Sequence, residues 1–141
     1  MPTDTANLSL PRPLVNKILA HAQKNPDVEV CGLIGNSTTQ QKDYYPIENV
    51  SRNPRCHFLM DAPQQISAIK QMRDKNQQLF AIIHSHPDTV ASPSRQDIEE
   101  SGYKDVFYLI ISLNTKGVLE MRAYTQQQKG MQEIDLVLED G

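Results

Sequence analysis

Short apolar runs bounded by turn-forming residues dominate the chain and predict a protein built largely of strands. The clearest runs, VEVCGLIG, LFAIIH and DVFYLIISL, have the length of strands. Pro46 interrupts a weaker run, which indicates a strand near a sheet edge because proline cannot donate to a central ladder. The predicted strands cover residues 28–35, 43–49, 57–60, 79–84, 105–113, 117–125 and 131–140.

Residues 11–25 carry the apolar spacing of an amphipathic helix. Prolines at its start cost little, because the first N–H groups of a helix have no partner within it. Asn25–Pro26 ends the segment, since the residue before a proline is disfavoured in the helical conformation. The apolar positions that recur at helical spacing are Leu14, Val15, Ile18, Leu19 and Ala22.

Two further segments are predicted to be helical. Asp61 is a suitable N-cap for a helix over residues 62–77. Ser94 opens a shorter helix over residues 94–101 in the same way. The apolar stripe of the longer helix consists of Ile66, Ile69 and Met72.

These elements predict a mixed α/β fold class, with a largely antiparallel or mixed sheet flanked by two longer helices and one short helix. A length of 141 residues suits one domain, so we expect a single domain over residues 1–141 with a disordered start at 1–6. The sequence NTKG at 114–117 is typical of a hairpin-like turn. The Gln-rich segment at 125–130 is expected to form a loop.

Composition excludes several classes of partner. Fourteen Lys and Arg against seventeen Asp and Glu give a formal charge of −3, so no basic field is available to bind nucleic acid. No apolar run approaches the roughly 18 residues that span a membrane. The two cysteines, Cys31 and Cys56, follow no secretory signal, which favours reduced thiols and a cytoplasmic location.

The sequence His84-Ser-His86 closes the apolar run LFAIIH and is the first candidate for chemistry. In an extended chain, side chains two residues apart point to the same side, about 6.6 Å apart, so two imidazoles can converge on one metal ion. Zinc accepts nitrogen and carboxylate ligands in tetrahedral geometry, and catalytic zinc keeps one position for water. Taken alone, the pair is a weak signal, because histidines in structural or exposed positions explain most such pairs.

Ser94 and Asp97 form a second pattern. Ser94 as N-cap and Asp97 at the third helical position make a variant of the capping box. Such capping would hold Asp97 in the first helical turn, close to the strand end that carries the histidines. Pro87 and Pro93 bracket the intervening loop and restrict its backbone. Asp97 is therefore a candidate third ligand as well as a capping residue.

Glu29, at the head of the run VEVCGLIG, is the remaining candidate carboxylate. A charge at the mouth of a buried strand is also explained by solvation, and spacing alone does not select Glu29. Structural roles are favoured for the other polar or reactive positions considered, which are Ser85, Cys31, His21, His57 and Asp88.

Taken together, these motifs resemble the signature of the JAMM (MPN+) metallopeptidase family. The chain carries it as Glu29, His84-Ser85-His86-Pro87, then seven residues between His86 and Ser94, and Ser94-x-x-Asp97. The resemblance extends over roughly residues 8–138. It implies a JAMM/MPN fold, which is similar to that of cytidine deaminases, and one Zn²⁺ per chain.

The resemblance also implies the role of each residue. His84, His86 and Asp97 would ligate zinc, with water as the fourth ligand. Glu29 would act as the general base that moves the proton of this water to the leaving amine. Ser94 would donate a hydrogen bond to the oxyanion of the tetrahedral intermediate.

The implied reaction is hydrolysis of a peptide or isopeptide bond after the C-terminal Gly of a ubiquitin-like or sulfur-carrier protein with a Gly-Gly tail. The short chain is similar to the compact standalone bacterial members that process sulfur carriers. A tail of this kind could add as a strand to a sheet edge beside the metal. The alternatives are an inactive MPN-type scaffold or ubiquitin-like binding module, and a different H-x-H metal hydrolase such as a phosphoesterase or amidohydrolase.

Overall fold

A curled, mixed sheet of seven strands forms the frame of the part of the chain described by the computed structural model, residues 7–115, 119–128 and 130–140. The strand order is β1-β7-β6-β5-β4-β2-β3. Pairs β1–β7 and β4–β5 are parallel, and the other neighbours are antiparallel. The strands are β1 (Asn7–Pro11), β2 (Cys31–Ser37), β3 (Lys42–Ile47), β4 (Gln77–His86), β5 (Phe107–Ser112), β6 (Glu120–Gln127) and β7 (Gly130–Glu139).

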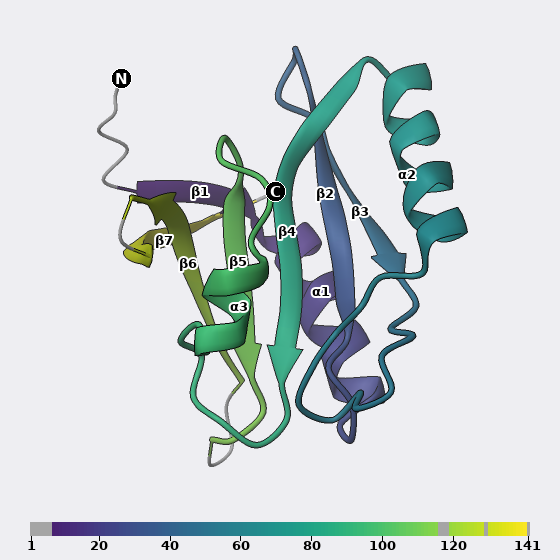
Figure 1. Cartoon of the computed structure of the whole chain (residues 1–141). Helices are drawn as coiled ribbons and strands as arrows, with labels where there is room; N and C mark the ends of the chain where they lie inside the picture. The colour runs from purple at the N-terminus through teal and green to yellow at the C-terminus, as the bar shows by residue number, and fades with distance from the viewer. Residues whose placement is uncertain (1–6, 116–118, 129, 141) are drawn as a thin grey trace.

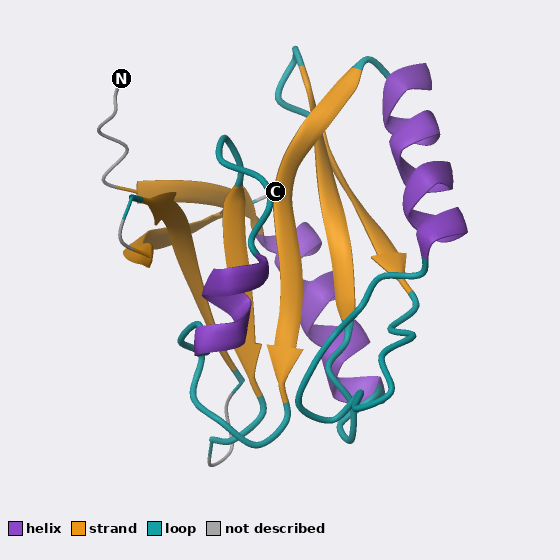
Figure 2. Ribbon diagram, viewed as in Figure 1, coloured by secondary structure: helices purple, strands orange, loops and turns teal. Residues whose placement is uncertain are grey.

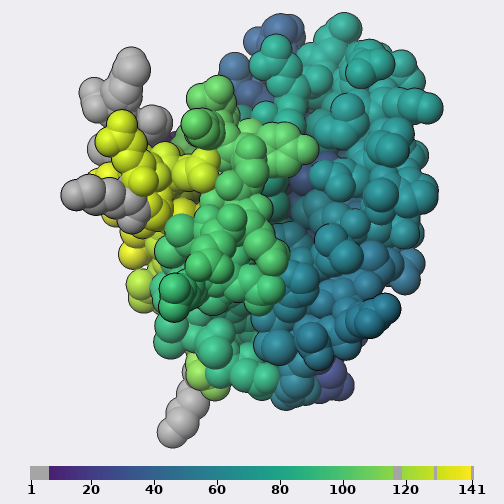
Figure 3. All heavy atoms as spheres, viewed as in Figure 1, coloured from purple at the N-terminus to yellow at the C-terminus, as the bar shows by residue number. Residues whose placement is uncertain are grey.

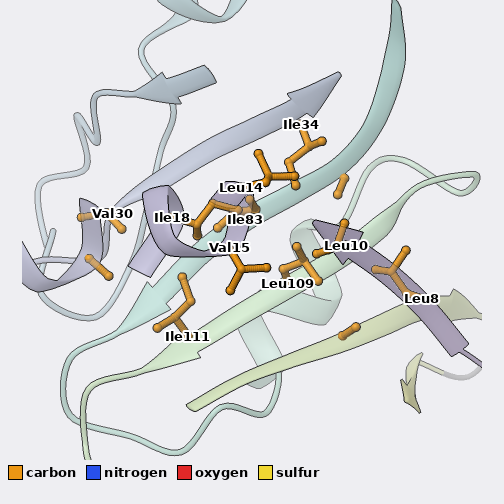
Figure 4. Packing of buried hydrophobic residues seen from close by; sticks show 13 residues of the cluster. Leu8, Leu10, Leu14, Val15, Ile18, Val30, Ile34, Ile83, Leu109 and Ile111 are labelled. Atoms are coloured by element: carbon orange, nitrogen blue, oxygen red, sulfur yellow. The ribbon is translucent and has the colours of Figure 1, made fainter. Parts of the chain in front are cut away.

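Helices cover both faces of the sheet, as Figure 1 shows. Helix α1 (Arg12–Lys24) packs on one face, where Ile18 and its apolar neighbours meet side chains of five strands in a buried cluster (Figure 4). Helices α2 (Ala62–Asp74) and α3 (Arg95–Glu100) lie on the opposite face. The fold class predicted from the sequence, a mixed sheet with two longer helices and one short helix, is confirmed.

The helix starts follow the predicted capping chemistry. The Asp61 side chain accepts a hydrogen bond from the Gln64 N–H at 3.1 Å and begins α2. Helix α2 ends earlier than predicted, at Asp74, because Asn76 adopts a positive φ of 56° and β4 begins at Gln77. Within the described residues, none of the helices has the length and apolarity of a membrane span.

Two of the sequence predictions for this face are wrong. Residues 57–60 do not form a strand and belong to the long loop between β3 and α2, in which Met60 makes only an isolated bridge to Asn49 (Figure 2). Ile66 is 58% exposed and lies outside the predicted apolar stripe of α2, whose buried positions are Ala68 and Met72. The loop path is fixed by side-chain hydrogen bonds, which a count of apolar residues does not detect.

The ends of the chain also differ from the prediction. Residues 7–11 form strand β1, paired in parallel with the C-terminal strand β7, although no strand was expected before α1. Thr125–Gln127, expected in a loop, continue strand β6. The predicted disorder of residues 1–6 and part of the predicted turn at 114–117 lie outside the described residues.

Strand β4 is longer than predicted and carries both candidate histidines. It runs from Gln77 to His86, so that both histidines of the H-x-H motif stand at its carboxyl end. Strand β3 is an edge strand, as Pro46 predicted, whereas β4 lies inside the sheet between β2 and β5. A peptide therefore cannot pair directly with β4, and strand addition at a sheet edge beside the site stays a prediction.

Candidate metal centre and active site

Three side chains converge at the carboxyl end of β4. The Nε2 atoms of His84 and His86 lie 3.1 Å apart, and each lies 3.1 Å from Oδ2 of Asp97. His84 and His86 alternate with Ser85 along the strand and so share a face. Asp97 reaches them from α3, which lies on that face (Figure 1). Ligands placed ~2.0 Å from a tetrahedral zinc ion lie ~3.3 Å from one another, which matches this triangle.

The hydrogen bonds around this triangle favour a cation at its centre. Nδ1 of His86 lies 2.8 Å from the carbonyl oxygen of Val90 and must donate to it, so Nε2 of neutral His86 is an acceptor. This lone pair faces Oδ2 of Asp97, which is also an acceptor. Among the described residues, Nδ1 of His84 and Oε1 of Glu29 are buried without a hydrogen-bond partner. Two imidazoles and a carboxylate in this arrangement fit a divalent ion such as zinc.

Electrostatics in the triangle favour an ionised carboxylate. Burial opposes ionisation of Asp97, but the adjacent imidazoles of His84 and His86 and the hydrogen bond from the Ser94 N–H hold its pKa well below the usual range. Burial lowers the pKa of His84, which keeps this imidazole neutral and available as a ligand. For His86, burial acts in the same direction, but contacts with Asp97 and the Val90 carbonyl raise its pKa.

Glu29 completes the group from the antiparallel neighbour of β4. Cys31 of β2 pairs with His84, so two residues earlier the chain brings Glu29 opposite His86. One carboxylate oxygen of Glu29 and one atom of each of the other three residues all lie within 4.8 Å of one another. Glu29 is only 4% exposed, and burial raises its pKa to about 8, with His86 lowering it and Asp97 raising it.

Ser94 caps α3 as the sequence predicted. Its Oγ accepts a hydrogen bond from the Asp97 N–H at 3.0 Å, and its own N–H donates to Oδ2 of Asp97 at 2.8 Å. The same Asp97 oxygen therefore faces both the cap and the two histidines. The Ser94 hydroxyl acts as an acceptor in the cap, which leaves its proton for donation to another oxygen.

The loop between β3 and α2, residues 48–61, closes the site from the other side and was not anticipated. The Phe58 ring stacks on the His84 ring, with centroids 4.6 Å apart. Arg55 makes a two-pronged ion pair with Asp88, at 2.7 and 2.8 Å. In the space-filling view, this blue-green loop and the green α3 segment meet on one face of the molecule (Figure 3).

A pocket of about 220 Å³ lies between this loop and α3, beside two of the converging side chains. Its walls are largely apolar, and His84 and Asp97 are among the residues that line it. A substrate segment lying in this pocket would reach the carboxyl end of β4. The apolar and aromatic residues of its walls include Phe58, Met60, Tyr103, Tyr108 and Met131.

The other side chains singled out in the sequence take structural positions. Cys31 is fully buried in an apolar cluster, and burial raises its thiol pKa to about 12. His21 bonds the Tyr44 hydroxyl at 2.7 Å, and His57 bridges Ser51 and Glu100. Ser85 accepts a hydrogen bond from the Val30 N–H at 2.9 Å, next to Glu29.

Sequence reasoning missed Phe58 and Asn49. Phe58 was assigned to a strand, and the aromatic character of the position carried no sign that it would stack on the His84 ring. Asn49 was assigned to the last position of the strand predicted over residues 43–49, where an amide is ordinary. An Asn at the start of a loop rich in Ser, Asn and Pro is a signal for a hydrogen-bonded turn, but not for its partners.

Comparison with known proteins agrees with this geometry. The family model described as prokaryotic homologs of the JAB domain matches residues 11–125. The Mycobacterium tuberculosis protein named CysO-cysteine peptidase is 29% identical over 113 residues, 79% of this chain and 77% of its own length. The Haloferax volcanii desampylase is 27% identical over 114 residues, 77% and 82% of the two chains. A Thermus thermophilus protein named probable TtuB-protein conjugate cleaving protease is 32% identical over 131 residues, 93% and 82% of the two chains.

Solved structures support the same assignment. A Desulfitobacterium hafniense protein superposes with a TM-score of 0.82 and 30% identity over 94% of this chain and 93% of its own. A JAB1/MPN domain protein from Archaeoglobus fulgidus has a TM-score of 0.53 at 19% identity, over 92% and 99% of the two chains, and shows the same fold. The fold expected from the JAMM resemblance is therefore confirmed, and the chain belongs to the JAMM/MPN family, among the prokaryotic homologs of the JAB domain.

Proposed function

We propose that the chain is a zinc-dependent peptidase that cleaves after the C-terminal Gly of a ubiquitin-like or sulfur-carrier protein. The enzyme class follows from the relatives, which are named as a peptidase, a desampylase and a conjugate-cleaving protease: the chain is a hydrolase of peptide or isopeptide bonds. The observation that carries the proposal is the gathering of Glu29, His84, His86 and Asp97, with one ligand atom from each lying within 4.8 Å of the others.

In this mechanism, His84, His86 and Asp97 would bind the metal ion, and Glu29 would act as general base and then as general acid. Bound zinc would lower the pKa of a water molecule from ~15.7 towards ~7 and polarise the scissile carbonyl. Glu29 accepts the proton of the attacking water and transfers it to the leaving amine. Its buried, unpartnered Oε1 is the oxygen available for this transfer.

The Ser94 hydroxyl stabilises the negative charge that develops on the carbonyl oxygen of the substrate. Its hydroxyl proton is free while its oxygen caps α3, so one side chain can hold Asp97 in place and donate to the oxyanion. The two roles are compatible because a hydroxyl can accept and donate at the same time.

The substrate tail is proposed to lie in the pocket between the 48–61 loop and α3. His84 and Asp97 line this pocket, and its largely apolar walls suit an extended, flexible segment without charged side chains. A tail that ends in Gly-Gly would bring its last carbonyl to the metal with little steric hindrance. The relatives named for CysO-cysteine, desampylation and TtuB conjugates support a small carrier protein as the partner.

Two earlier alternatives lose their support. An inactive scaffold would not need the four converging side chains, which are all present and buried or nearly so. A phosphoesterase or amidohydrolase of the H-x-H type requires a different fold with more metal ligands. We place the enzyme in the cytoplasm, a location supported by the two cysteines, which are both unpaired in the structure.

Mass spectrometry of a defined adduct tests the proposal. The probes are a small ubiquitin-like carrier ending in Gly-Gly, joined through its terminal carboxyl either to free cysteine or to a lysine side chain of a second protein. Incubation with the enzyme should restore the mass of the free carrier for at least one probe, and a chelator should prevent this. Intact adducts after incubation with zinc-loaded enzyme would refute the proposed function.

A further inference from the structure

The backbone around Glu29 is not part of a regular strand, so its position must be fixed by other contacts. Strand β2 begins only at Cys31. On one side, Val30 exchanges hydrogen bonds with Ser85, the residue between the two histidines. On the other side, the Glu29 N–H donates to the Pro54 carbonyl at 2.6 Å, and its carbonyl accepts from the Asn49 side chain at 2.9 Å.

Asn49 is the centre of the second set of contacts. Its Nδ2 donates to the carbonyl oxygens of Glu29 at 2.9 Å and His57 at 3.0 Å, with Pro54 more distant at 3.4 Å. Its Oδ1 accepts from the N–H groups of Ser51 and Leu59, both at 3.0 Å. The amide orientation is unambiguous, because carbonyls require a donor and N–H groups require an acceptor.

These contacts divide Asn49 into two functional halves. The acceptor half, Oδ1, shapes the 48–61 loop through Ser51 and Leu59. The donor half, Nδ2, ties that loop to the backbone of Glu29 and also bonds the loop carbonyl of His57. The Nδ2 contact is the one that affects catalysis. The Glu29 carboxylate must reach a water molecule beside the metal, and it tolerates little displacement.

We infer that Asn49 is a positioning residue for Glu29: its Nδ2 holds the Glu29 carbonyl and thereby sets the carboxylate against His84, His86 and Asp97. This inference rests on the proposed role of Glu29 as the proton carrier. It assigns to Asn49 an effect on turnover that is transmitted through Glu29 and separate from any effect on folding, metal binding or substrate binding.

The substitution Asn49→Asp separates the two halves. It keeps the shape and the acceptor oxygen for Ser51 and Leu59 but removes the donor to Glu29. We expect kcat on the carrier adduct to fall on the order of 10- to 100-fold, the range produced by small displacements of a catalytic group. KM and zinc content should stay close to the wild-type values, whereas Tm should fall modestly, because the His57 carbonyl loses its donor as well. Asn53→Asp is the matched control, since it makes the same change at an exposed position of the same loop.

A double-mutant cycle with Glu29→Gln distinguishes a positioning role from a structural one. If Asn49 acts through Glu29, adding Asn49→Asp to Glu29→Gln should cause no further loss in single-turnover rate. An equal further loss in the double variant, or a wild-type kcat for Asn49→Asp, would overturn the inference. If Asn49→Asp folds poorly, Asn49→Ala is judged by the same cycle.

A crystal structure of the zinc-loaded Asn49→Asp variant gives a readout that does not depend on the substrate. The inference predicts that the Glu29 backbone moves relative to His84 and His86, and an unmoved Glu29 would contradict it. Failure of the proposed function appears differently, as an intact adduct with the wild-type enzyme. If the wild type is active, Glu29→Gln is inactive and Asn49→Asp is fully active, the proposed function stands. Only the positioning role of Asn49 is then refuted.

Discussion

His84 and His86 hold their Nε2 atoms 3.1 Å apart, with the residue between them bonded to the backbone beside Glu29. Period-two alternation on β4 brings the two imidazoles to one face, and the Ser85 side chain on the other face bonds the segment that carries Glu29. One short strand end therefore places the ligands and also anchors the neighbouring Glu29.

Loss of one ligand should remove the metal. His86→Ala or Asp97→Ala leaves two protein ligands in place of three, so purified protein should contain much less than one zinc per chain and should not cleave the adduct. Elemental analysis measures the metal. His21→Ala is the control, because His21 bonds Tyr44 away from the site and its loss should leave zinc content unchanged.

Glu29→Gln should keep the metal and lose turnover. The amide retains the size of the side chain but cannot accept and release the proton, so the rate should fall on the order of 10²- to 10⁴-fold. Rates and zinc content measured on the same preparation separate the two effects. Glu133→Gln, an exposed change on β7, is the matched control. Full activity of Glu29→Gln would show that another group carries the proton.

The two roles of Ser94 can be separated by comparing Ser94→Gly with Ser94→Ala. Glycine at an N-cap costs only a few tenths of a kcal/mol, whereas alanine costs about 0.5–2 kcal/mol. Both remove the hydroxyl, so both should lower kcat on the order of 10²- to 10³-fold, while Tm should fall mainly for Ser94→Ala. Thermal unfolding and steady-state rates provide the comparison. A Ser94→Gly variant with normal turnover would assign Ser94 to capping alone.

Ser85→Ala should destabilise the fold. The Ser85 side chain is fully buried, and its removal leaves the Val30 N–H without its acceptor. The free energy of unfolding should fall by about 1–3 kcal/mol, as for other buried groups that lose a partner. Urea unfolding of the metal-free protein measures this, with the exposed Ser92→Ala expected to change it by less than about 0.5 kcal/mol. An unchanged midpoint for Ser85→Ala would argue against the bond.

Local chemistry explains which parts of the structure the sequence predicted. The caps of Asp61 and Ser94 and the shared face of His84 and His86 depend on neighbours within four residues, and the structure contains all of them. The pairing of β1 with β7 joins the two ends of the chain, which no local pattern reports.

The site shows the same division. Asp97 was placed near the histidines by the short, proline-bracketed loop that joins them, but Glu29 could be selected only through the family resemblance. Its approach depends on the register of β2 against β4. The roles of Asn49 and Phe58 depend on the path of the 48–61 loop, which side-chain hydrogen bonds and stacking determine. Such contacts leave no periodic trace in the sequence.

Anomalous diffraction at the zinc edge, from crystals of protein purified without added chelator, tests the central claim most directly. The account predicts one peak per chain, ~2.0–2.2 Å from Nε2 of His84, Nε2 of His86 and Oδ2 of Asp97, with Glu29 nearby and not bound to the ion. A peak elsewhere, or no peak with the two imidazoles turned away from each other, would contradict it.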